Sequence, residues 1–346
     1  MSNRGGTLAK LVEGRFPGAT VTAQERLAGD ASTRRYVRLR LDGPEAPATA
    51  IAMILAAPTP ADAPELPFPN VARYLASRGV GVPTVYAVRD RDLGALLLED
   101  VGDTPLADVL ASAVITEAEA ERHLAQVARL LADMATSGGS PDCVAFDRSH
   151  DEELIRRELD VVLTHGLAAS DEGPPRGRRD DPEAEAALAE LGATIAAQPR
   201  RLMHRDFHAW NLHVDARGHL RVIDFQDAML GPPLYDLASF CTDRDSDRFV
   251  TPARERFLLD ALHTALADAA VDLYTDRTML ERDYYTCVVF RTLRVIGRFR
   301  WLAIEDGVKR YLPYLPRMAR QTRRALDALE ASSLARVLAH RNPDFA

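Results

Sequence analysis

The sequence predicts an α+β fold of two lobes: a small antiparallel β-sheet lobe with one helix, then a larger, mainly helical lobe. In the first hundred residues, short strand-like runs alternate with turns rich in Gly, Asp and Pro. Beyond residue 102, apolar residues recur at helical spacing instead. A chain of 346 residues is long enough to bury two separate cores. We therefore expect an N-terminal lobe over residues 1–101 and a C-terminal lobe over residues 102–346.

The strands of the N-terminal lobe are recognised by apolar and β-branched residues between turn-forming residues. The predicted strands are Thr20 to Leu27, Arg34 to Leu41, Thr49 to Leu55, Val85 to Arg89 and Gly94 to Glu99. A helix is expected over Asn70 to Ser77, because Gly79 follows it as a stop signal. The segment from Glu99 to Asp103 is then expected to be the hinge between the lobes.

The C-terminal lobe begins with a strong helix signal. Residues Thr116 to Thr136 have apolar side chains at helical spacing, Glu in the first turn and glycines after the last. A polar segment rich in Gly and Pro, about residues 166–182, is expected to be a flexible surface insertion. The last hundred residues are predicted to be helical except around Pro313 and Pro316.

Composition excludes several classes of protein. The net charge of −8 argues against a nucleic-acid binder, which would usually carry a basic domain. The most apolar run, Ala48 to Ala57, is about half the length of a membrane span, and the first residues lack the apolar core of a signal peptide. The three cysteines are far apart, which favours reduced thiols. We expect a cytoplasmic protein, a monomer, that binds neither membrane nor nucleic acid.

The most informative segment runs from His204 to Asn211 and reads His-Arg-Asp-Phe-His-Ala-Trp-Asn. In this spacing the Asp can accept the proton of an attacking hydroxyl while the Asn holds Mg²⁺ during phosphoryl transfer. Residues 212–222 read as a short hairpin, and Asp224-Phe225 follow it. The hairpin would bring Asp224 back beside Asn211, so that both reach one metal cluster. Asp and Asn also form ordinary turns, but the three-part pattern is more specific than either alone.

This order of parts resembles the protein-kinase-like fold in its aminoglycoside phosphotransferase branch. Only a few residues separate Asp224-Phe225 from the segment Gly231 to Asp236, so no activation loop fits between them. Enzymes of that branch hold a small molecule in a pocket and need no peptide platform. The resemblance implies that Asp236 stabilises the catalytic loop, although capping of a helix N-terminus is an equally good role.

Three further segments resemble the bacterial anomeric N-acetylmuramate/N-acetylglucosamine kinases. They are Gly29-Asp30-Ala31-Ser32-Thr33-Arg34-Arg35-Tyr36, Asp224-Phe225-Gln226-Asp227-Ala228 and the stretch from Arg291 to Pro316. The resemblance implies an ATP- and Mg²⁺-dependent kinase that phosphorylates the 1-hydroxyl of these sugars in peptidoglycan recycling. The sugar would be its small-molecule partner.

The expected roles follow from the motif and the resemblance. Asp206 is the catalytic base, and Asn211 and Asp224 hold Mg²⁺. The residues expected to bind ATP are Gly29, Asp30, Ser32, Thr33, Arg35, Glu99 and Val101, the last two through the backbone of the hinge. His208, Trp210 and Asp227 are expected to border the sugar, with loop packing an alternative role for Trp210.

One departure from kinases concerns the phosphate-binding lysine of the third strand. Met53 stands near the expected position, and no lysine occurs between Lys10 and Lys309. An arginine beside the phosphate loop could replace it, because the guanidinium presents forked donors to phosphate. Strand alternation puts Arg34 and Arg38 on one face and Arg35 on the other, and we favour Arg35.

Charge helps to choose among hydroxyl substrates. Residues 281–346 contain 13 Lys and Arg but 7 Asp and Glu. A pocket for polycationic aminoglycosides should be acidic, so a basic region better suits an acidic sugar such as N-acetylmuramate. Two other hypotheses stay open: a kinase of the aminoglycoside, choline or homoserine phosphotransferase type, and a nucleotide-binding pseudokinase.

Overall fold

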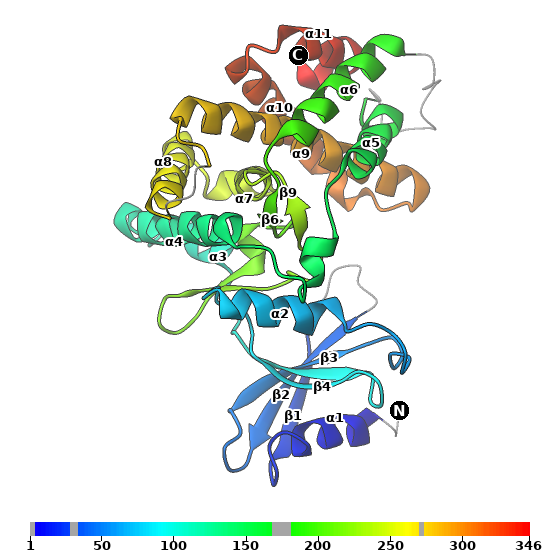
Figure 1. The fold of residues 1–346 in the computed structure, drawn as a ribbon, viewed down its shortest axis with the longest axis vertical. Helices are drawn as coiled ribbons and strands as arrows, with labels where there is room; N and C mark the ends of the chain where they lie inside the picture. The colour runs from blue at the N-terminus through cyan, green and yellow to red at the C-terminus, as the bar shows by residue number, and fades with distance from the viewer. Residues whose placement is uncertain (1–3, 28–33, 168–180, 270–272) are drawn as a thin grey trace. The chain divides into compact units, whose positions relative to one another are not determined.

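The computed structural model describes residues 4–27, 34–167, 181–269 and 273–346 (Figure 1). The chain forms two compact units, and each is discontinuous in sequence. The first comprises residues 1–104 and 213–226, and the second comprises residues 105–212 and 227–346. The boundary between lobes expected at residue 101 stays a prediction. In the two compact units, residues 213–226, which follow the catalytic loop, belong with the first unit.

A five-stranded antiparallel sheet organises the first unit. Its strands are β1 (Thr20–Arg26), β2 (Arg35–Asp42), β3 (Thr49–Ile54), β4 (Val85–Arg89) and β5 (Ala95–Glu99). Their order across the sheet is β1-β2-β3-β5-β4. Every strand lies within a residue or so of the segment predicted for it, because each is bounded by turn-forming residues.

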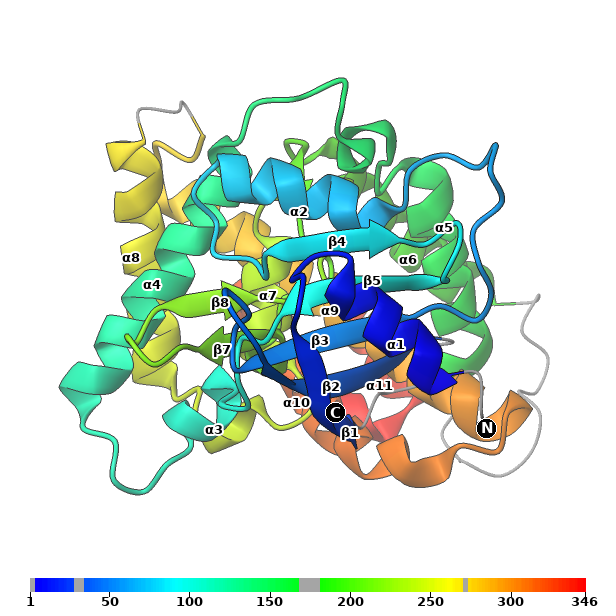
Figure 2. The ribbon, with the colours of Figure 1, turned by 90° about the horizontal axis from the view of Figure 1, so that it is seen from below.

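Helix α1 (Arg4–Glu13) was not predicted: we expected one helix in this unit, and its described residues form two, α1 and a later helix. Two glycines at its start obscure the helical pattern, but Leu8, Leu11 and Val12 follow at helical spacing and are buried. Figure 2 shows α1 across the sheet, where these side chains share a core with Leu39 and Leu97. Burial of this apolar face outweighs the low helix propensity of the glycines.

The expected helix is α2 (Pro67–Ser77), which begins three residues earlier than predicted and contacts β4. The predicted hairpin is also present, as β7 (Leu212–Val214) and β8 (Leu220–Val222). Its turn includes Gly218, whose φ of +79° is a conformation that glycine adopts without strain. The Val214 N–H donates a hydrogen bond to the Thr104 carbonyl, and the Val222 N–H donates one to the Gly81 carbonyl. These two hydrogen bonds attach the hairpin to the rest of the first unit.

The second unit is mainly helical, as predicted. Its α-helices are α3 (Leu106–Leu110), α4 (Glu117–Thr136), α5 (Glu152–Val161), α6 (Pro182–Ala197), α7 (Tyr235–Thr242), α8 (Pro252–Asp268), α9 (Arg277–Glu305), α10 (Leu315–Ala328) and α11 (Ser332–Arg341). A π-helical turn at Val162–Gly166 continues α5, and a short pair of strands, β6 (Arg201–Met203) and β9 (Met229–Gly231), lies beside these helices.

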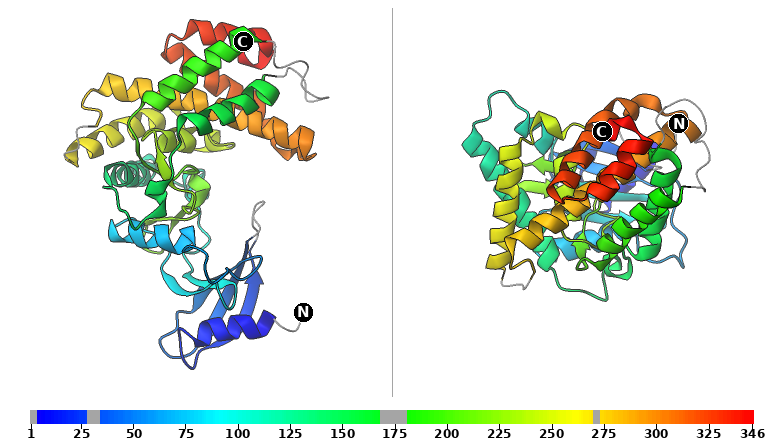
Figure 3. Two further views of the ribbon diagram at one scale, coloured as in Figure 1. Left: turned by 45° about the vertical axis from the view of Figure 1, so that its right-hand side comes forward. Right: turned by 90° about the horizontal axis from the view of Figure 1, so that it is seen from above.

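Helix α9 is the central element of this unit. It packs against α7, α10 and the end of α5, and half of its residues are buried, including Cys287, Phe290 and Leu293. Two views in Figure 3 show α11, in red, beside α6, in green, at the C-terminal end of the unit. The three cysteines are buried and free of disulfides, as predicted. No helix in the described part of the chain is long and apolar enough to cross a membrane.

Candidate active site

The loop from His204 to Asn211 leaves β6 and is held in place by a buried carboxylate. Asp236, in the first turn of α7, accepts backbone hydrogen bonds from His204 at 2.6 Å and from Arg205 at 2.9 Å. Burial raises the pKa of Asp236 to about 6, while the His204 charge and these hydrogen bonds lower it. Among the described residues, the Asp236 carboxylate accepts hydrogen bonds from the loop and from no N–H of α7, so the loop-stabilising role expected for it is confirmed.

Arg205 adopts a left-handed backbone conformation with a φ of +80°. A residue with a Cβ is strained there, and it stays there only when its surroundings hold it. Asp236 binds its N–H group, and its guanidinium donates to Glu158 at 3.2 Å. The strained residue therefore turns the chain immediately before Asp206.

Asp206 is partly exposed, and in the described ranges no hydrogen bond or ion pair reaches its carboxylate. Its backbone carbonyl instead accepts a 2.9 Å hydrogen bond from Nδ2 of Asn211, and a 3.0 Å bond from the His208 N–H. Because the amide nitrogen of Asn211 is engaged in this way, its Oδ1 is the atom that can coordinate a cation. The carboxylate of Asp206 is accessible to a substrate hydroxyl.

His208 and Trp210 both have partners inside the second unit. The His208 Nε2 lies 3.3 Å from Nδ2 of Asn211, and burial lowers the His208 pKa, so the neutral ring accepts this hydrogen bond. The Trp210 indole donates to Asp245 at 3.0 Å. These contacts agree with loop packing for both side chains, and their contact with a sugar stays a prediction. Asp227 is exposed.

A charged cluster beside the catalytic loop centres on Glu158 of α5, whose side chain is 12% exposed. Its Oε1 accepts hydrogen bonds from Arg205 at 3.2 Å and Arg294 at 2.8 Å, and its Oε2 lies 2.9 Å from His150. Burial raises the Glu158 pKa, but the Arg294, His150 and Arg205 charges outweigh burial and lower it to about 2. Glu158 is therefore an anion at all ordinary pH values.

Asp224 lies in the first unit, two residues after the end of β8. Its φ of +61° is left-handed, and Nε2 of Gln226 donates to its Oδ1 at 2.9 Å. Phe225 is buried and packs on Phe68 of α2 with ring centroids 4.8 Å apart. Phe225 is buried, whereas the Asp224 side chain before it is exposed. Asn211 belongs to the other unit, and their meeting around one metal stays a prediction.

Within the described residues, no group of three or more His, Cys, Asp or Glu could hold a metal ion. The predicted pair of Asn211 and Asp224 supplies oxygen ligands, which suit Mg²⁺. Mg²⁺ takes six ligands and commonly completes its shell with phosphate oxygens and water, so two protein ligands are compatible with a nucleotide-bound ion.

The residues expected to form the hinge, Glu99 to Asp103, are only partly available for a nucleotide. The Glu99 N–H donates to the Thr84 carbonyl at 2.8 Å, so only its carbonyl could meet an adenine edge. Val101 differs, since its N–H has no backbone or side-chain acceptor among the described residues. Arg38 donates to Asp100 at 2.7 Å and to Asp103 at 2.6 Å, which commits it to the hinge and removes it as a phosphate ligand.

Four predicted ATP-binding residues, Gly29, Asp30, Ser32 and Thr33, lie outside the described residues. Arg35 is the first residue of β2 and pairs with Ile54 of β3. Met53, at the position of the missing lysine, is buried and pairs with Tyr36. Burial raises the Tyr36 pKa, Arg34 lowers it and the Asp224 charge raises it, so Arg34 and Asp224 each lie near Tyr36. Arg35 points to the opposite face of the strand.

Comparison with known proteins assigns the family. The model of the phosphotransferase enzyme family matches residues 23–278, which include β2, the catalytic loop and Asp224. The chain belongs to this family. It is therefore an enzyme that transfers a phosphoryl group and uses a nucleotide as the donor.

Individual relatives of this phosphotransferase differ in substrate. An N-acetylmuramate/N-acetylglucosamine kinase of Caulobacter vibrioides is 30% identical over 324 residues, covering 84% of each chain. A homoserine kinase of Pseudomonas aeruginosa is 30% identical over 221 residues, covering 63% of this chain and 66% of its own. A choline kinase of Streptococcus pneumoniae superposes with a TM-score of 0.57 at 14% identity, covering 95% of this chain and all of its own. The last likeness supports the protein-kinase-like fold.

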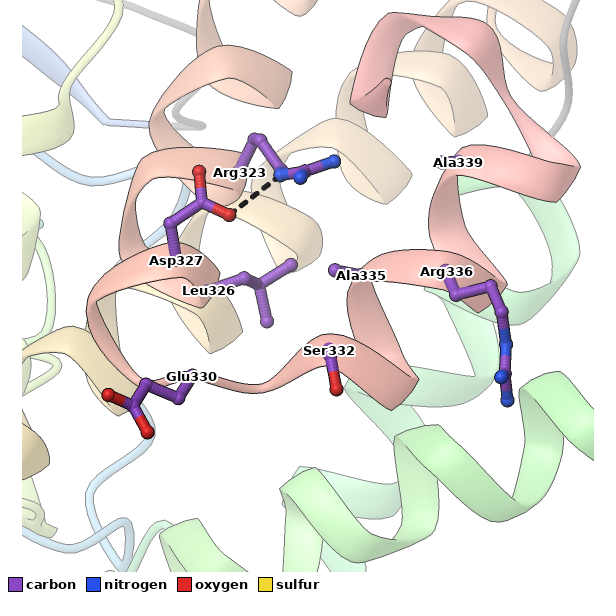
Figure 4. A pocket seen from close by; sticks show the side chains of 8 residues that line it. All are labelled: Arg323, Leu326, Asp327, Glu330, Ser332, Ala335, Arg336 and Ala339. Atoms are coloured by element: carbon purple, nitrogen blue, oxygen red, sulfur yellow. Dashed lines mark hydrogen bonds and ion pairs between the residues drawn. The ribbon is translucent and has the colours of Figure 1, made fainter.

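A separate pocket of about 470 Å³ lies away from the catalytic loop of this phosphotransferase, between α10 and α11. Figure 4 shows its lining, where Arg323 and Asp327 pair on one helix and Arg336 lies on the other. None of the predicted site residues lines it.

The sequence alone did not indicate the role of Glu158 or the partners of Arg294. Arg294 lay inside a segment matched to the sugar kinases, which was a signal that could have singled it out. Glu158 had no such signal, because a glutamate on an amphipathic helix is ordinarily solvated. Only the structure places α5 and α9 so that the two side chains meet.

Proposed function

We propose that the protein is an ATP- and Mg²⁺-dependent kinase that phosphorylates the anomeric 1-hydroxyl of N-acetylmuramate and N-acetylglucosamine. The similarity to a kinase for these sugars, over 84% of the chain, carries the proposal. The homoserine kinase relative matches a smaller part of the chain, so homoserine is the second candidate. The intact catalytic loop opposes a pseudokinase.

Asp206 is proposed as the base. The sugar's 1-hydroxyl would donate a hydrogen bond to its carboxylate, and the hydroxyl oxygen would attack the γ-phosphorus in line with the β,γ-bridging oxygen. The bond from phosphorus to the bridging oxygen breaks, ADP leaves, and Asp206 takes the hydroxyl proton late in the transfer. The anomeric hydroxyl is more acidic than an ordinary alcohol, which suits a carboxylate base.

Asn211 and Asp224 are proposed as the magnesium ligands, and their support is the motif spacing and the oxygen atom that each can offer. The bound ion would neutralise charge on the phosphates. The hinge is proposed to meet adenine through the Glu99 carbonyl and the Val101 N–H, with the segment of Gly29, Asp30, Ser32 and Thr33 beside the phosphates.

The cation that replaces the strand lysine is proposed to come from β2. Arg35 stays the candidate from sequence, and Arg34 joins it because it interacts with Tyr36, whose pKa also responds to the charge of Asp224. Arg34→Gln and Arg35→Gln, measured side by side, should differ: the variant that raises KM for ATP at least tenfold identifies the phosphate ligand. We also propose that the enzyme works as a cytoplasmic monomer, where ATP and recycled sugars are available.

The test is ATP consumption with N-acetylmuramate, N-acetylglucosamine, L-homoserine, choline and kanamycin. We expect turnover with both amino sugars, a 1-phosphate product by phosphorus NMR, and loss of turnover in Asp206→Ala. The exposed Asp268→Ala is the control and should keep full activity. Turnover of neither amino sugar would reject the substrate, and unchanged turnover in Asp206→Ala would reject the base.

A further inference from the structure

Arg294 of α9 is held in one orientation beside the catalytic loop. Its Nε donates to Glu158 at 2.8 Å, and its Nη1 donates to the Tyr235 hydroxyl at 3.0 Å. Tyr235 is buried and directly precedes Asp236, which binds the loop backbone at His204 and Arg205. Glu158 also binds Arg205, the residue before Asp206. Both partners of Arg294 therefore connect it to the segment that carries the base.

Close packing of α9 on the π-helical turn after α5 makes this arrangement possible. Gly297 lies one helical turn beyond Arg294, and a Cβ there would come within 3.1 Å of the Val162 backbone. Glycine lets the two elements approach closely enough for Arg294 to reach Glu158. The guanidinium therefore has a preformed position and loses little freedom when it binds a further group.

The guanidinium has unused donors and keeps its charge. Arginine carries five N–H donors, of which the Arg294 contacts to Glu158 and Tyr235 use two. Its side chain is 23% exposed, so part of it is in contact with solvent. Glu158 is shared with Arg205 and His150, so its carboxylate is not committed to Arg294 alone. Burial lowers the Arg294 pKa, but Tyr235, Glu158 and Asp206 raise it above its ordinary value, so it is always charged.

We propose that Arg294 is the specificity-determining residue of the acceptor site and binds the lactyl carboxylate of N-acetylmuramate while Asp206 faces the 1-hydroxyl. This inference rests on the proposed function and adds to it a residue that reads one substituent. N-acetylmuramate differs from N-acetylglucosamine by a lactyl ether on O3, which places a carboxylate on a substituent two ring carbons away from the carbon that bears the reacting hydroxyl. A forked guanidinium edge suits a carboxylate. N-acetylglucosamine has no carboxylate, so the proposed contact is absent when that sugar binds.

The test compares two sugars in two variants. In Arg294→Gln, we expect the ratio of kcat/KM for N-acetylmuramate to that for N-acetylglucosamine to fall at least tenfold, mostly through KM for N-acetylmuramate. Arg282→Gln removes an exposed basic residue from the same helix, and the ratio should stay within twofold of wild type. Turnover of N-acetylglucosamine reports on folding in both variants. Equal loss for the two sugars in Arg294→Gln would overturn the inference.

A change in the substrate tests the same contact without altering the protein. The carboxamide of N-acetylmuramate keeps the shape of the lactyl group and removes its charge. With wild-type enzyme its kcat/KM should fall at least tenfold below that of N-acetylmuramate, and Arg294→Gln should change it less than threefold. A carboxamide used as well as the acid would overturn the inference, whatever the folding of the variant. If wild type used neither amino sugar, the proposed function itself would fail.

Discussion

The carboxylate of Asp236 accepts a 2.6 Å hydrogen bond from the backbone N–H of His204, and its second oxygen binds the next N–H along the chain. Two adjacent N–H groups of the catalytic loop thus converge on one buried anion. A carboxylate has two acceptor atoms and no donor, so it matches this pair as no neutral side chain of the same size does. The position of Asp206 depends on this match.

Asp236→Asn should separate loop geometry from substrate binding. The amide offers one acceptor and turns a donor toward the second N–H, which leaves a buried donor unpaired at a cost of about 2 kcal/mol. We expect kcat to fall on the order of 10²-fold with little change in KM for the sugar. Steady-state kinetics and thermal unfolding would measure both effects. Asp268→Asn, at an exposed position, should change neither, and a full-activity Asp236→Asn enzyme would contradict the role.

Much of the fold followed from local patterns in the sequence. All five strands of the sheet, α2 and the hairpin after the catalytic loop were predicted, since turn-forming residues bound each of them. Helix α1 was missed because the glycines at its start lower local propensity, and only packing against the sheet at Leu11 makes it stable. Tertiary burial of this kind is invisible to a window of sequence.

The candidate site was predictable where residue spacing encodes it. Asp206, Asn211, Asp224 and Asp236 follow one another in a recognisable order, but ion pairs between distant segments leave no trace in the sequence. Arg38 was considered for phosphate, whereas it pairs with Asp100, 62 residues away. Glu158 and Arg294 are 136 residues apart, so the sequence did not indicate that they form a pair. Long-range charge pairing needs the tertiary structure.

Asp224→Asn should abolish activity without weakening the fold. Asn tolerates the left-handed conformation that residue 224 adopts, and its Oδ1 can still accept the hydrogen bond from Gln226. The change removes the negative charge expected to hold Mg²⁺, so we expect turnover to fall at least ~10²-fold while the unfolding free energy stays within about 0.5 kcal/mol. Asp224→Ala should lose the same activity and also stability. Raised Mg²⁺ should partly restore Asp224→Asn, and strong turnover at low Mg²⁺ would argue against the ligand role.

The Glu99–Arg221 ion pair should contribute measurably to the stability of the first unit. It is bidentate, at 2.8 and 2.7 Å, and Thr84 supplies two further hydrogen bonds to the same carboxylate. A double-mutant cycle with Glu99→Gln and Arg221→Met should give a coupling free energy of about 1–2 kcal/mol.

The Glu65–Arg73 pair is the matched control for that cycle, because it is also bidentate but its side chains are 43% and 62% exposed. Solvent screening should reduce its coupling to less than about 0.5 kcal/mol in urea unfolding experiments. Equal coupling free energies for the two pairs would mean that burial does not strengthen the Glu99–Arg221 pair.

Glu158 should make the protein sensitive to acid. Its folded-state pKa of about 2 lies below the ordinary value of 4.5, so its contribution to stability is fully present above pH 4.5 and is lost as pH falls toward 2. A difference of this size corresponds to a contribution of about 3 kcal/mol. Glu158→Gln should therefore be less stable than wild type at pH 7, with the gap closing between pH 4.5 and 2, when urea midpoints are compared across this range. Glu153→Gln, exposed on the same helix, should keep the wild-type profile. A gap for Glu158→Gln that stays constant with pH would show that the side chain acts by packing, and not by its charge beside Arg205 and Arg294.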